Sequence, residues 1–251
     1  EFPSVLVTGA TGFVGQAMIA KLCELGVTKI VCASRTRRIS EHKNVSFFQC
    51  GEAKDWGDVL KGCEVVVHLA ARVHVMQETS TNPLAEFRRV NVQGTLDLAL
   101  KAAAAGVTRF VFVSSIKVNG ESTQLGLPFK ADDVPAPQDA YGVSKMEAEQ
   151  GLREIARQTG MEVVIVRPPL VHGPGVKANF AAMMRWLRLG VPLPFGAIHN
   201  QRSLVALDNL VDLIVICLTH PAAANQTFLV SDGEDISTTR LLRSMGQAMG
   251  R

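Results

Sequence analysis

The sequence predicts a doubly wound α/β fold with a parallel sheet, followed by a smaller, loop-rich C-terminal part. Short, continuous apolar runs alternate with longer segments of helical periodicity. Such runs are typical of parallel strands buried on both faces, and strand–helix–strand repetition implies right-handed crossovers within one sheet. The predicted strands are Ser4–Thr8, Lys29–Ala33, Val65–Leu69, Arg109–Ser114 and Glu162–Arg167; the predicted helical segments are Gly15–Leu25, Trp56–Lys61, Asn91–Ala105 and Ser144–Thr159.

The pattern changes after Arg167. Pro168-Pro169, Gly173-Pro174-Gly175 and Pro192–Gly196 interrupt the alternation and predict loops. We therefore expect a main domain over residues 3–167 and a smaller part over residues 168–251. The second part is expected to cover the open end of the sheet, where ligands bind in doubly wound folds.

Composition excludes several classes of protein. The 251 residues are 47% apolar and 20% charged, which is ordinary for a globular chain, and no apolar run is long enough to span a membrane. A net charge of +3 is too small to indicate a nucleic-acid partner. The five cysteines are scattered, and none pairs at metal-ligand spacing, so we expect no metal site and a reducing cytoplasmic location.

The first predicted strand leads directly into a glycine-rich loop, Gly9-Ala10-Thr11-Gly12-Phe13-Val14-Gly15, and then into a helix. The glycines permit a tight turn, a close approach of backbone to a pyrophosphate, and close helix–strand packing. The following helix N-terminus offers free N–H groups to phosphates. This arrangement predicts a Rossmann-type dinucleotide site formed by Gly9, Thr11, Gly12, Phe13, Val14 and Gly15.

The end of the second predicted strand bears on the choice of dinucleotide. An NAD site favours an acidic side chain here, which binds the ribose 2′-hydroxyl. This chain has Ser34 and Arg35 instead, followed by Arg37 and Arg38. A hydroxyl and guanidinium groups suit a 2′-phosphate, so Ser34, Arg35 and Arg38 predict NADP, with NAD as the alternative.

Tyr141 and Lys145 lie four residues apart, on one face at the start of a predicted helix. A tyrosine with an ordinary pKa near 10 is a poor base at neutral pH, but a nearby ammonium and a bound nicotinamide cation favour phenolate. Ser115 follows the fourth predicted strand, at the edge where reacting groups collect. We predict that Tyr141 transfers a proton and that Ser115 orients the reacting oxygen. Lys145 is expected to favour the phenolate form of Tyr141 and to hold the nicotinamide ribose, so Tyr141 and Lys145 both lie at the cofactor.

Together these motifs resemble the extended short-chain dehydrogenase/reductase family, which contains nucleotide-sugar epimerases, dehydratases and ketoreductases. The resemblance covers nearly the whole chain, from T-G-x-x-G-F-V-G at Thr8–Gly15, through S-S-x-x-V-x-G at Ser114–Gly120 and Y-x-x-x-K, to R-P-x-x-V-x-G-P-G at Arg167–Gly175. By this resemblance, the cofactor also contacts Leu69, Ala70, Ala71, Asn91 and Pro168. The diphosphate of the sugar contacts Asn179 and Arg202, and His74 is expected to face the sugar as a polar residue in the loop after the third strand.

The resemblance implies a nucleotide-sugar oxidoreductase acting at the sugar 4-position on a substrate that is UDP-linked. The sequences of Ala70–Met76 and Ser114–Glu121 resemble those of a branch of the family that is associated with bacterial polysaccharide sugar synthesis. The missing acid after the second strand favours a 4-keto-sugar reductase that consumes NADPH. A UDP-hexose 4-epimerase is the first alternative, and a non-catalytic dinucleotide-binding redox sensor is the second.

The chain departs from the family pattern at informative positions. Asn119 and His172 stand where the family commonly has tyrosine, which leaves Tyr141 as the only tyrosine of the chain. Ile116 and Lys117 replace the acidic pair of the dehydratases, which argues against dehydration. Relatives usually extend beyond the equivalent of Arg251, so we expect the substrate-binding part to be truncated. They dimerise through the helices matching Asn91–Ala105 and Ser144–Thr159, which predicts a homodimer.

Overall fold

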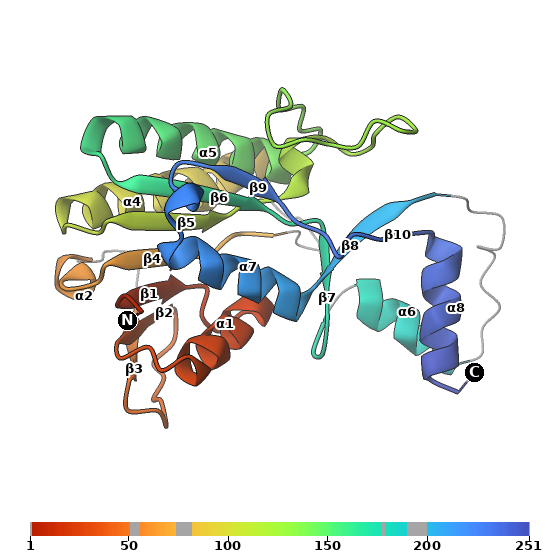
Figure 1. The fold of residues 1–251 in the computed structure, drawn as a ribbon, viewed down its shortest axis with the longest axis horizontal. Coiled ribbons are helices and arrows are strands. Elements are labelled where there is room, and N and C mark those ends of the chain that lie inside the picture. The colour runs from red at the N-terminus through yellow and green to blue at the C-terminus, as the bar shows by residue number, and fades with distance from the viewer. Residues whose placement is uncertain (1, 51–55, 74–81, 177–178, 190–199, 251) are drawn as a thin grey trace.

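A computed structural model describes residues 2–50, 56–73, 82–176, 179–189 and 200–250. Its main feature is a parallel sheet of seven strands in the order β3-β2-β1-β4-β5-β6-β9 (Figure 1). The strands are β1 (Val5–Thr8), β2 (Ile30–Ser34), β3 (Val45–Gln49), β4 (Val65–His68), β5 (Arg109–Val113), β6 (Glu162–Arg167) and β9 (Thr227–Leu229). This confirms the predicted Rossmann-type doubly wound fold.

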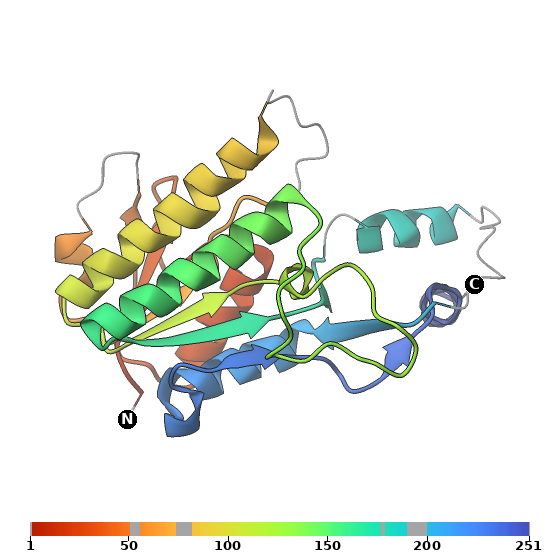
Figure 2. The same ribbon diagram turned by 90° about the horizontal axis from the view of Figure 1, so that it is seen from above.

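Both faces of this sheet are covered, which explains why its inner strands are continuously apolar. On one face, Val5 and Val7 of β1 pack with residues of α1 and α7. On the other face, Leu6 packs with residues of α4 and α5, which lie side by side (Figure 2). The helices of these two layers are α1 (Phe13–Glu24), α7 (Leu207–Thr219), α4 (Gly94–Ala104) and α5 (Ala140–Thr159), with the short α2 (Gly57–Leu60) and α3 (Pro83–Phe87) between strands.

The remaining elements form a smaller group at one end of the large sheet (Figures 1 and 2). Three short strands pair in the order β10-β8-β7. They are β7 (Leu170–His172), β8 (Arg202–Ala206) and β10 (Asp235–Ile236), and they accompany α6 (Asn179–Arg188) and α8 (Thr238–Ala248), which pack against each other.

The chain after residue 167 contributes to both parts of the fold. α7 and β9 return to the large sheet, where β9 pairs with β6. The boundary predicted at residue 167 therefore does not coincide with the boundary between the two sheets. That residues 168–251 bind the substrate stays a prediction.

Two features differ from the predicted elements. β3 was not predicted, because this edge strand reads Val-Ser-Phe-Phe-Gln and is only partly buried, so it shows neither a continuous apolar run nor a clean alternation. The predicted helix Asn91–Ala105 begins earlier, as a π-helical segment η1 (Arg88–Gln93) that continues into α4. Such widened turns are often found at functional sites.

Within the part of the chain that the structure describes, no helix is both long and apolar enough to cross a membrane. The same part holds no group of three or more histidine, cysteine or acidic side chains arranged to bind a metal ion.

Candidate active site

The strand order brings several sequence motifs to one edge of the large sheet. β1 has β2 on one side and β4 on the other, so the chain reverses direction across the sheet at this point. Ligands of doubly wound folds bind at such a switch point, outside the carboxyl ends of the strands. The loops after β1, β2, β4, β5 and β6 all leave the sheet at this edge.

The loop between β1 and α1 depends on its glycines for different reasons. Gly9 has a positive φ of 67°, and a Cβ there would lie 2.7 Å from the backbone nitrogen of Ala70. A Cβ on Gly15 would lie 2.2 Å from the carbonyl oxygen of Gly9. A Cβ on Gly12 would approach only that same oxygen, at 3.1 Å. Gly9 and Gly15 thus allow the loop to pack, whereas Gly12 keeps the loop's outer side free of a side chain.

The N-terminus of α1 fits a pyrophosphate. Its N-cap is Gly12, no side chain caps the first turn, and that turn contains no acidic residue. The first N–H groups of a helix lack partners within the helix and carry a partial positive charge, so they attract phosphate. Thr11, Phe13 and Val14 lie in the same turn, at or near the surface. A dinucleotide therefore fits the backbone of this loop.

The end of β2 presents positive charge. Ser34 is buried, and its Oγ accepts a hydrogen bond from the backbone N–H of Thr36 at 3.4 Å. Arg35, Arg37 and Arg38 are exposed, and their guanidinium groups pair with nothing in the described ranges. These guanidinium groups remain available to an anion.

Leu69, Ala70 and Ala71 follow β4 and are fixed against the glycine loop. The backbone N–H of Leu69 donates to the carbonyl oxygen of Thr8 at 3.3 Å, and that of Ala70 donates to Thr8 Oγ1 at 3.2 Å. His68 supports this contact from within the core: its Nδ1 lies 2.7 Å from Thr8 Oγ1 and its Nε2 lies 2.9 Å from Thr95 Oγ1. Burial, assisted by the positive charge of Lys145, lowers the pKa of His68 to about 3, so this histidine is neutral and structural.

Asn91 occupies the π-helical segment η1 and is buried. Its Oδ1 accepts from the backbone N–H of Arg72 at 2.8 Å, and its Nδ2 donates to the carbonyl oxygen of Arg72 and to Ser144 Oγ, both at 3.0 Å. The amide thus joins the loop after β4 to α5. Its predicted contact with the cofactor stays a prediction, and these bonds show that it also holds the site together.

The predicted reacting hydroxyls lie together. Ser115 follows β5 and Tyr141 is in the first turn of α5, and the Ser115 hydroxyl lies near enough to the phenol to act on its pKa. Phe87 lies edge-on to the Tyr141 ring, with 6.1 Å between the ring centroids. Desolvation raises the pKa of Tyr141 to about 12 despite the opposing effect of the Ser115 hydroxyl. In this state Tyr141 holds its proton, and a positively charged ligand would be needed to favour phenolate.

Lys145 is buried one turn after Tyr141. Its Nζ donates to the carbonyl oxygen of Val113 at 2.9 Å and lies 4.4 Å from the centroid of the Phe112 ring. Burial lowers the pKa of Lys145 to about 7, although the nearby Glu149 acts in the opposite direction. The amine can therefore change its charge near neutral pH, a common property of groups in catalytic sites.

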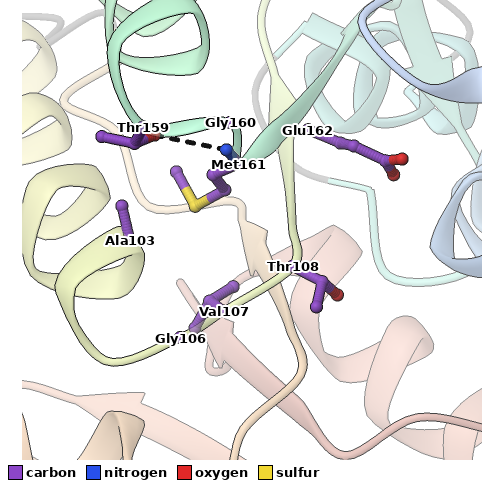
Figure 3. Close-up of a pocket in the computed structure, with 8 residues that line it drawn as sticks. All are labelled: Ala103, Gly106, Val107, Thr108, Thr159, Gly160, Met161 and Glu162. Atoms are coloured by element: carbon purple, nitrogen blue, oxygen red, sulfur yellow. Dashed lines mark hydrogen bonds between the residues drawn. The ribbon is translucent and has the colours of Figure 1, made fainter.

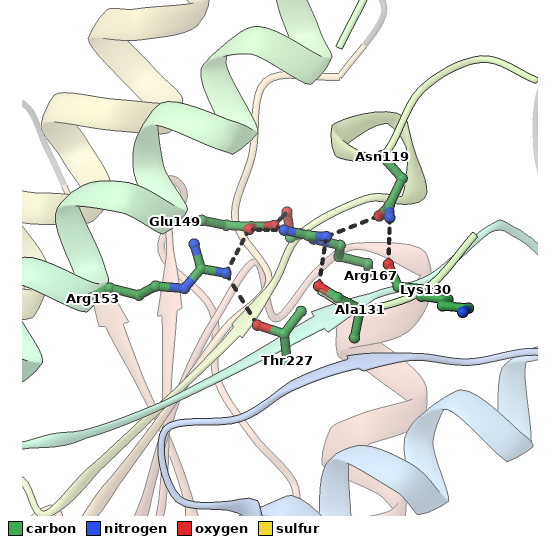
Figure 4. Close-up of polar contacts among 8 residues, drawn as sticks. Asn119, Lys130, Ala131, Glu149, Arg153, Arg167 and Thr227 are labelled. Atoms are coloured by element: carbon green, nitrogen blue, oxygen red, sulfur yellow. Dashed lines mark hydrogen bonds and ion pairs between the residues drawn. The ribbon is translucent and has the colours of Figure 1, made fainter. Parts of the chain in front are cut away.

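Behind these residues lies a buried ion pair (Figure 4). Arg167, at the end of β6, donates from Nε and Nη2 to the two carboxylate oxygens of Glu149 at 2.9 and 2.6 Å. Ser114 Oγ donates to Glu149 Oε1 at 2.6 Å, and Arg167 Nη1 donates to Asn119 Oδ1 at 2.9 Å. The network fixes the ends of β5 and β6 against α5, immediately behind Ser115 and Lys145.

The residues predicted to bind the sugar are less closely assembled. Arg202 begins β8 and is exposed, and Asn179 begins α6. Pro168, which is predicted to contact the cofactor and not the sugar, is buried directly after β6, where its carbonyl oxygen accepts from the backbone N–H of Ile116 at 3.0 Å. His74 lies outside the described residues. The structure thus places Arg202 and α6 in the smaller group of elements, beyond the carboxyl edge of the large sheet (Figure 1).

A shallow pocket of about 520 Å³ lies at the opposite edge of the sheet (Figure 3). It is bounded by the ends of α4 and α5 and by the starts of β5 and β6, and its lining is Ala103, Gly106, Val107, Thr108, Thr159, Gly160, Met161 and Glu162. Its only charged side chain, Glu162, pairs with Arg109. This pocket is separate from the predicted catalytic residues.

The model of the NAD dependent epimerase/dehydratase family matches residues 5–231. The chain belongs to this family. Members of the NAD dependent epimerase/dehydratase family are enzymes of the extended short-chain dehydrogenase/reductase type, as the resemblance implied.

Similar proteins within the family agree in fold and class. A UDP-glucose 4-epimerase from Vibrio cholerae is 49% identical over 252 residues, covering 99% of this chain and 76% of its own. The solved structure of MoeE5 in complex with UDP-glucuronic acid and NAD superposes with a TM-score of 0.85 at 26% identity, covering 98% of this chain and 82% of MoeE5. A UDP-glucose 4-epimerase from Thermotoga maritima, solved with UDP-glucose, gives a TM-score of 0.80 at 26% identity, covering 98% and 82%.

Some residues that shape the site were not predicted from the sequence. Asp139 caps α5, with its Oδ1 accepting from the backbone N–H of Gly142 at 2.6 Å. An aspartate directly before a helical segment is a recognisable N-cap signal. The pairing of Glu149 with Arg167 had no such signal, because the two residues meet only when α5 packs on β6. The same holds for His172, whose Nε2 lies 3.0 Å from Asp232 Oδ2.

Proposed function

We propose that this protein is a UDP-hexose 4-epimerase. The observation that carries the proposal is the neighbouring pair of hydroxyls of Ser115 and Tyr141, which lies at the same sheet edge as a glycine loop suited to a dinucleotide. The 49% identical relative from Vibrio cholerae, a UDP-glucose 4-epimerase, supports it. We therefore prefer the 4-epimerase, which was the first alternative from the sequence, to the 4-keto-sugar reductase that the sequence favoured. Because members of the family are enzymes, its membership argues against a non-catalytic sensor.

The residues suggest a division of tasks. Tyr141 takes the proton of the sugar 4-hydroxyl and returns it, and Ser115 holds the same oxygen by a hydrogen bond. Lys145, held at the end of β5, adds positive charge that favours the phenolate form of Tyr141 when the amine is protonated. The bound nicotinamide dinucleotide supplies the acceptor and donor of hydride. Phe87 packs edge-on against the Tyr141 ring.

The decisive experiment compares turnover with and without added cofactor. We expect purified protein to interconvert UDP-glucose and its 4-epimer with no added dinucleotide, because an epimerase regenerates its cofactor in each cycle. Chromatography of the UDP-hexoses measures this directly. A requirement for stoichiometric NADPH, with a 4-keto sugar as substrate, would contradict the epimerase.

A 4-keto-sugar reductase remains a second candidate because of one observation. Arg35 and Arg38 offer exposed guanidinium groups at the end of β2, which suit the 2′-phosphate of NADP. The similar structure of MoeE5 holds NAD, which favours NAD in this protein as well, and the choice between NAD and NADP is part of this proposal. Mass spectrometry of the dinucleotide released from purified protein distinguishes the two, and Arg35→Ala with Arg38→Ala should weaken NADP binding while sparing NAD.

We also propose a homodimer formed through α4 and α5. These helices lie side by side on one face of the large sheet, and Leu100 of α4 is half exposed there (Figure 2). Size-exclusion chromatography with light scattering should give twice the chain mass of 27.0 kDa. A monomer at micromolar concentration would contradict the proposal.

A further inference from the structure

An ion pair outside the predicted catalytic set joins the two segments that carry the reacting hydroxyls. Lys117 lies in the single turn η2 (Ile116–Val118), directly after Ser115. Its Nζ donates to Asp139 Oδ2 at 2.5 Å and to Glu121 Oε1 at 2.9 Å. Asp139 precedes α5, the helix that carries Tyr141. The pair therefore connects the turn after β5 with the start of α5.

Each partner of this pair also contacts the backbone next to a reacting hydroxyl. The backbone N–H of Lys117 donates to Ser115 Oγ at 3.3 Å. Asp139 Oδ1 accepts from the backbone N–H of Gly142, the residue after Tyr141, at 2.6 Å. The segments are packed closely, since a Cβ on Gly142 would lie 3.0 Å from the carbonyl oxygen of Lys117. A change in the Lys117–Asp139 distance would thus move Ser115 relative to Tyr141.

We propose that Lys117 and Asp139 are positioning residues for the reaction at Tyr141: their ion pair sets the position of the Ser115 hydroxyl relative to the phenol and balances the charge beside it. This inference rests on the proposed function, because it assigns a role in proton transfer at Tyr141. Neither residue is required to touch the substrate. Both side chains are about one quarter to one third exposed, so they remain partly solvated.

The electrostatic part of the proposal has a definite sign. Among the described residues, Lys117 lowers the pKa of Tyr141 and Asp139 raises it. The other elements around the ring contribute differently: α3 presents the apolar Phe87, and Arg88 after it pairs with Glu147. On α5, Lys145 is held by the carbonyl of Val113, and His68 on β4 is neutral. Glu121 accepts a hydrogen bond from Lys117 Nζ at 2.9 Å, so its carboxylate lies beside Lys117.

The variants follow from this balance. Lys117→Met removes the positive charge and leaves Asp139, so the pKa of Tyr141 should rise by about half a unit to one unit. Asp139→Asn removes the negative charge yet keeps a good N-cap, so the pKa should fall by a similar amount. The double variant should return the pKa close to that of the wild type. All three lose the ion pair, whereas Lys117→Arg retains it and should restore the wild-type behaviour.

The pKa can be measured without turnover, because Tyr141 is the only tyrosine of the chain. Incorporation of 3-fluorotyrosine gives a single ¹⁹F resonance, and fluorination lowers the pKa of the phenol, so that the titration falls at a lower pH. Titration of the resonance in each variant tests the predicted opposite shifts. Shifts of the same sign in Lys117→Met and Asp139→Asn, or no shift in either, would overturn the proposal.

Turnover tests the geometric part. We expect kcat for UDP-hexose interconversion to fall about tenfold in both single variants and in the double variant, with KM changed less than about twofold. Glu154→Gln is the matched control, since it breaks another ion pair of α5, with Arg157, and should leave kcat and the ¹⁹F titration unchanged. An unchanged kcat in Lys117→Met would overturn the positioning role. If the wild type does not act on UDP-hexoses, the proposed function fails, while the titration still decides the charge balance.

Discussion

The seven-stranded and three-stranded sheets of this protein differ in how deeply their side chains are buried. In the large sheet, β1, β2 and β4 are buried along their whole lengths, and helices cover both faces. In the small sheet, β8 exposes Arg202 and Ser203, and β7 is only partly buried. The large sheet is therefore held by burial of apolar side chains, whereas the small one presents polar side chains at its surface.

The residues predicted to bind the dinucleotide and transfer the proton lie on the large sheet, whereas those predicted to bind the sugar nucleotide lie elsewhere. The dinucleotide loop, Ser115, Tyr141 and Lys145 all follow strands of the large sheet or lie in helices packed on it. Arg202 and Asn179 lie in the small group of elements. The comparison implies that changes near the large sheet alter chemistry or stability, while changes in the small sheet alter affinity for the sugar nucleotide.

The largest expected effect tests the chemistry on the large sheet. Tyr141→Phe keeps the ring that packs against Phe87 and removes the hydroxyl beside Ser115. We expect kcat to fall about a thousandfold, the scale of general acid–base catalysis, with dinucleotide affinity within about twofold of the wild type. Steady-state kinetics and isothermal titration calorimetry measure the two quantities. Retention of more than about a tenth of the turnover would break the assignment of proton transfer to Tyr141.

The second effect tests the buried ion pair behind the site. Glu149→Gln leaves Arg167, which is 1% exposed, without its carboxylate, and should lower the free energy of unfolding by about 3 kcal/mol. Urea unfolding followed by circular dichroism measures this loss. Glu154→Gln breaks an exposed pair with Arg157 on the same helix and should change stability by less than about 0.5 kcal/mol. Equal losses in the two variants would show that burial does not set the difference.

The third effect tests the packing of the glycine loop. A Cβ at Gly15 would lie 2.2 Å from the Gly9 carbonyl oxygen, so Gly15→Ala should cost about 2 kcal/mol of stability and weaken dinucleotide binding. Gly94 is the matched control. It has helical φ and ψ of −62° and −37°, and a Cβ there would meet only the Arg89 carbonyl oxygen at 3.7 Å. Gly94→Ala should therefore stabilise the protein slightly, and thermal unfolding compares the two.

The smallest expected effect comes from a substitution in the small sheet, which should change only the KM for the UDP-sugar. If Arg202 binds the diphosphate as proposed, Arg202→Ala removes a charged hydrogen bond to it and should raise KM for the UDP-sugar about tenfold. The melting temperature, kcat and dinucleotide affinity should stay unchanged, since the side chain is exposed. Arg240→Ala, at another exposed arginine beside this sheet, provides the control. A loss of kcat in Arg202→Ala without a change in KM would remove the separation between the two sheets.

Local sequence signals predicted much of the glycine loop and of the group of residues expected to transfer the proton. A glycine spacing between a strand and a helix constrains backbone geometry directly, which is why the roles of Gly9 and Gly15 could be predicted. Tyr141 and Lys145 share one helix, so their spacing alone places them near each other. β3 was missed because a half-buried edge strand carries a weak pattern, and the π-helical start at Arg88 was missed because it depends on tertiary bonds of Asn91.

By itself, the sequence determined most of the strands and helices up to Arg167, the glycine loop and the residues expected to react, because these depend on short-range periodicity and backbone preference. The tertiary structure alone decided which distant side chains meet. It pairs Glu149 with Arg167 and Lys117 with Asp139, and it withdraws Lys145 from water far enough to lower its pKa to about 7. Such pairings and desolvation depend on how α5 packs against the ends of β5 and β6, and no local pattern encodes that packing.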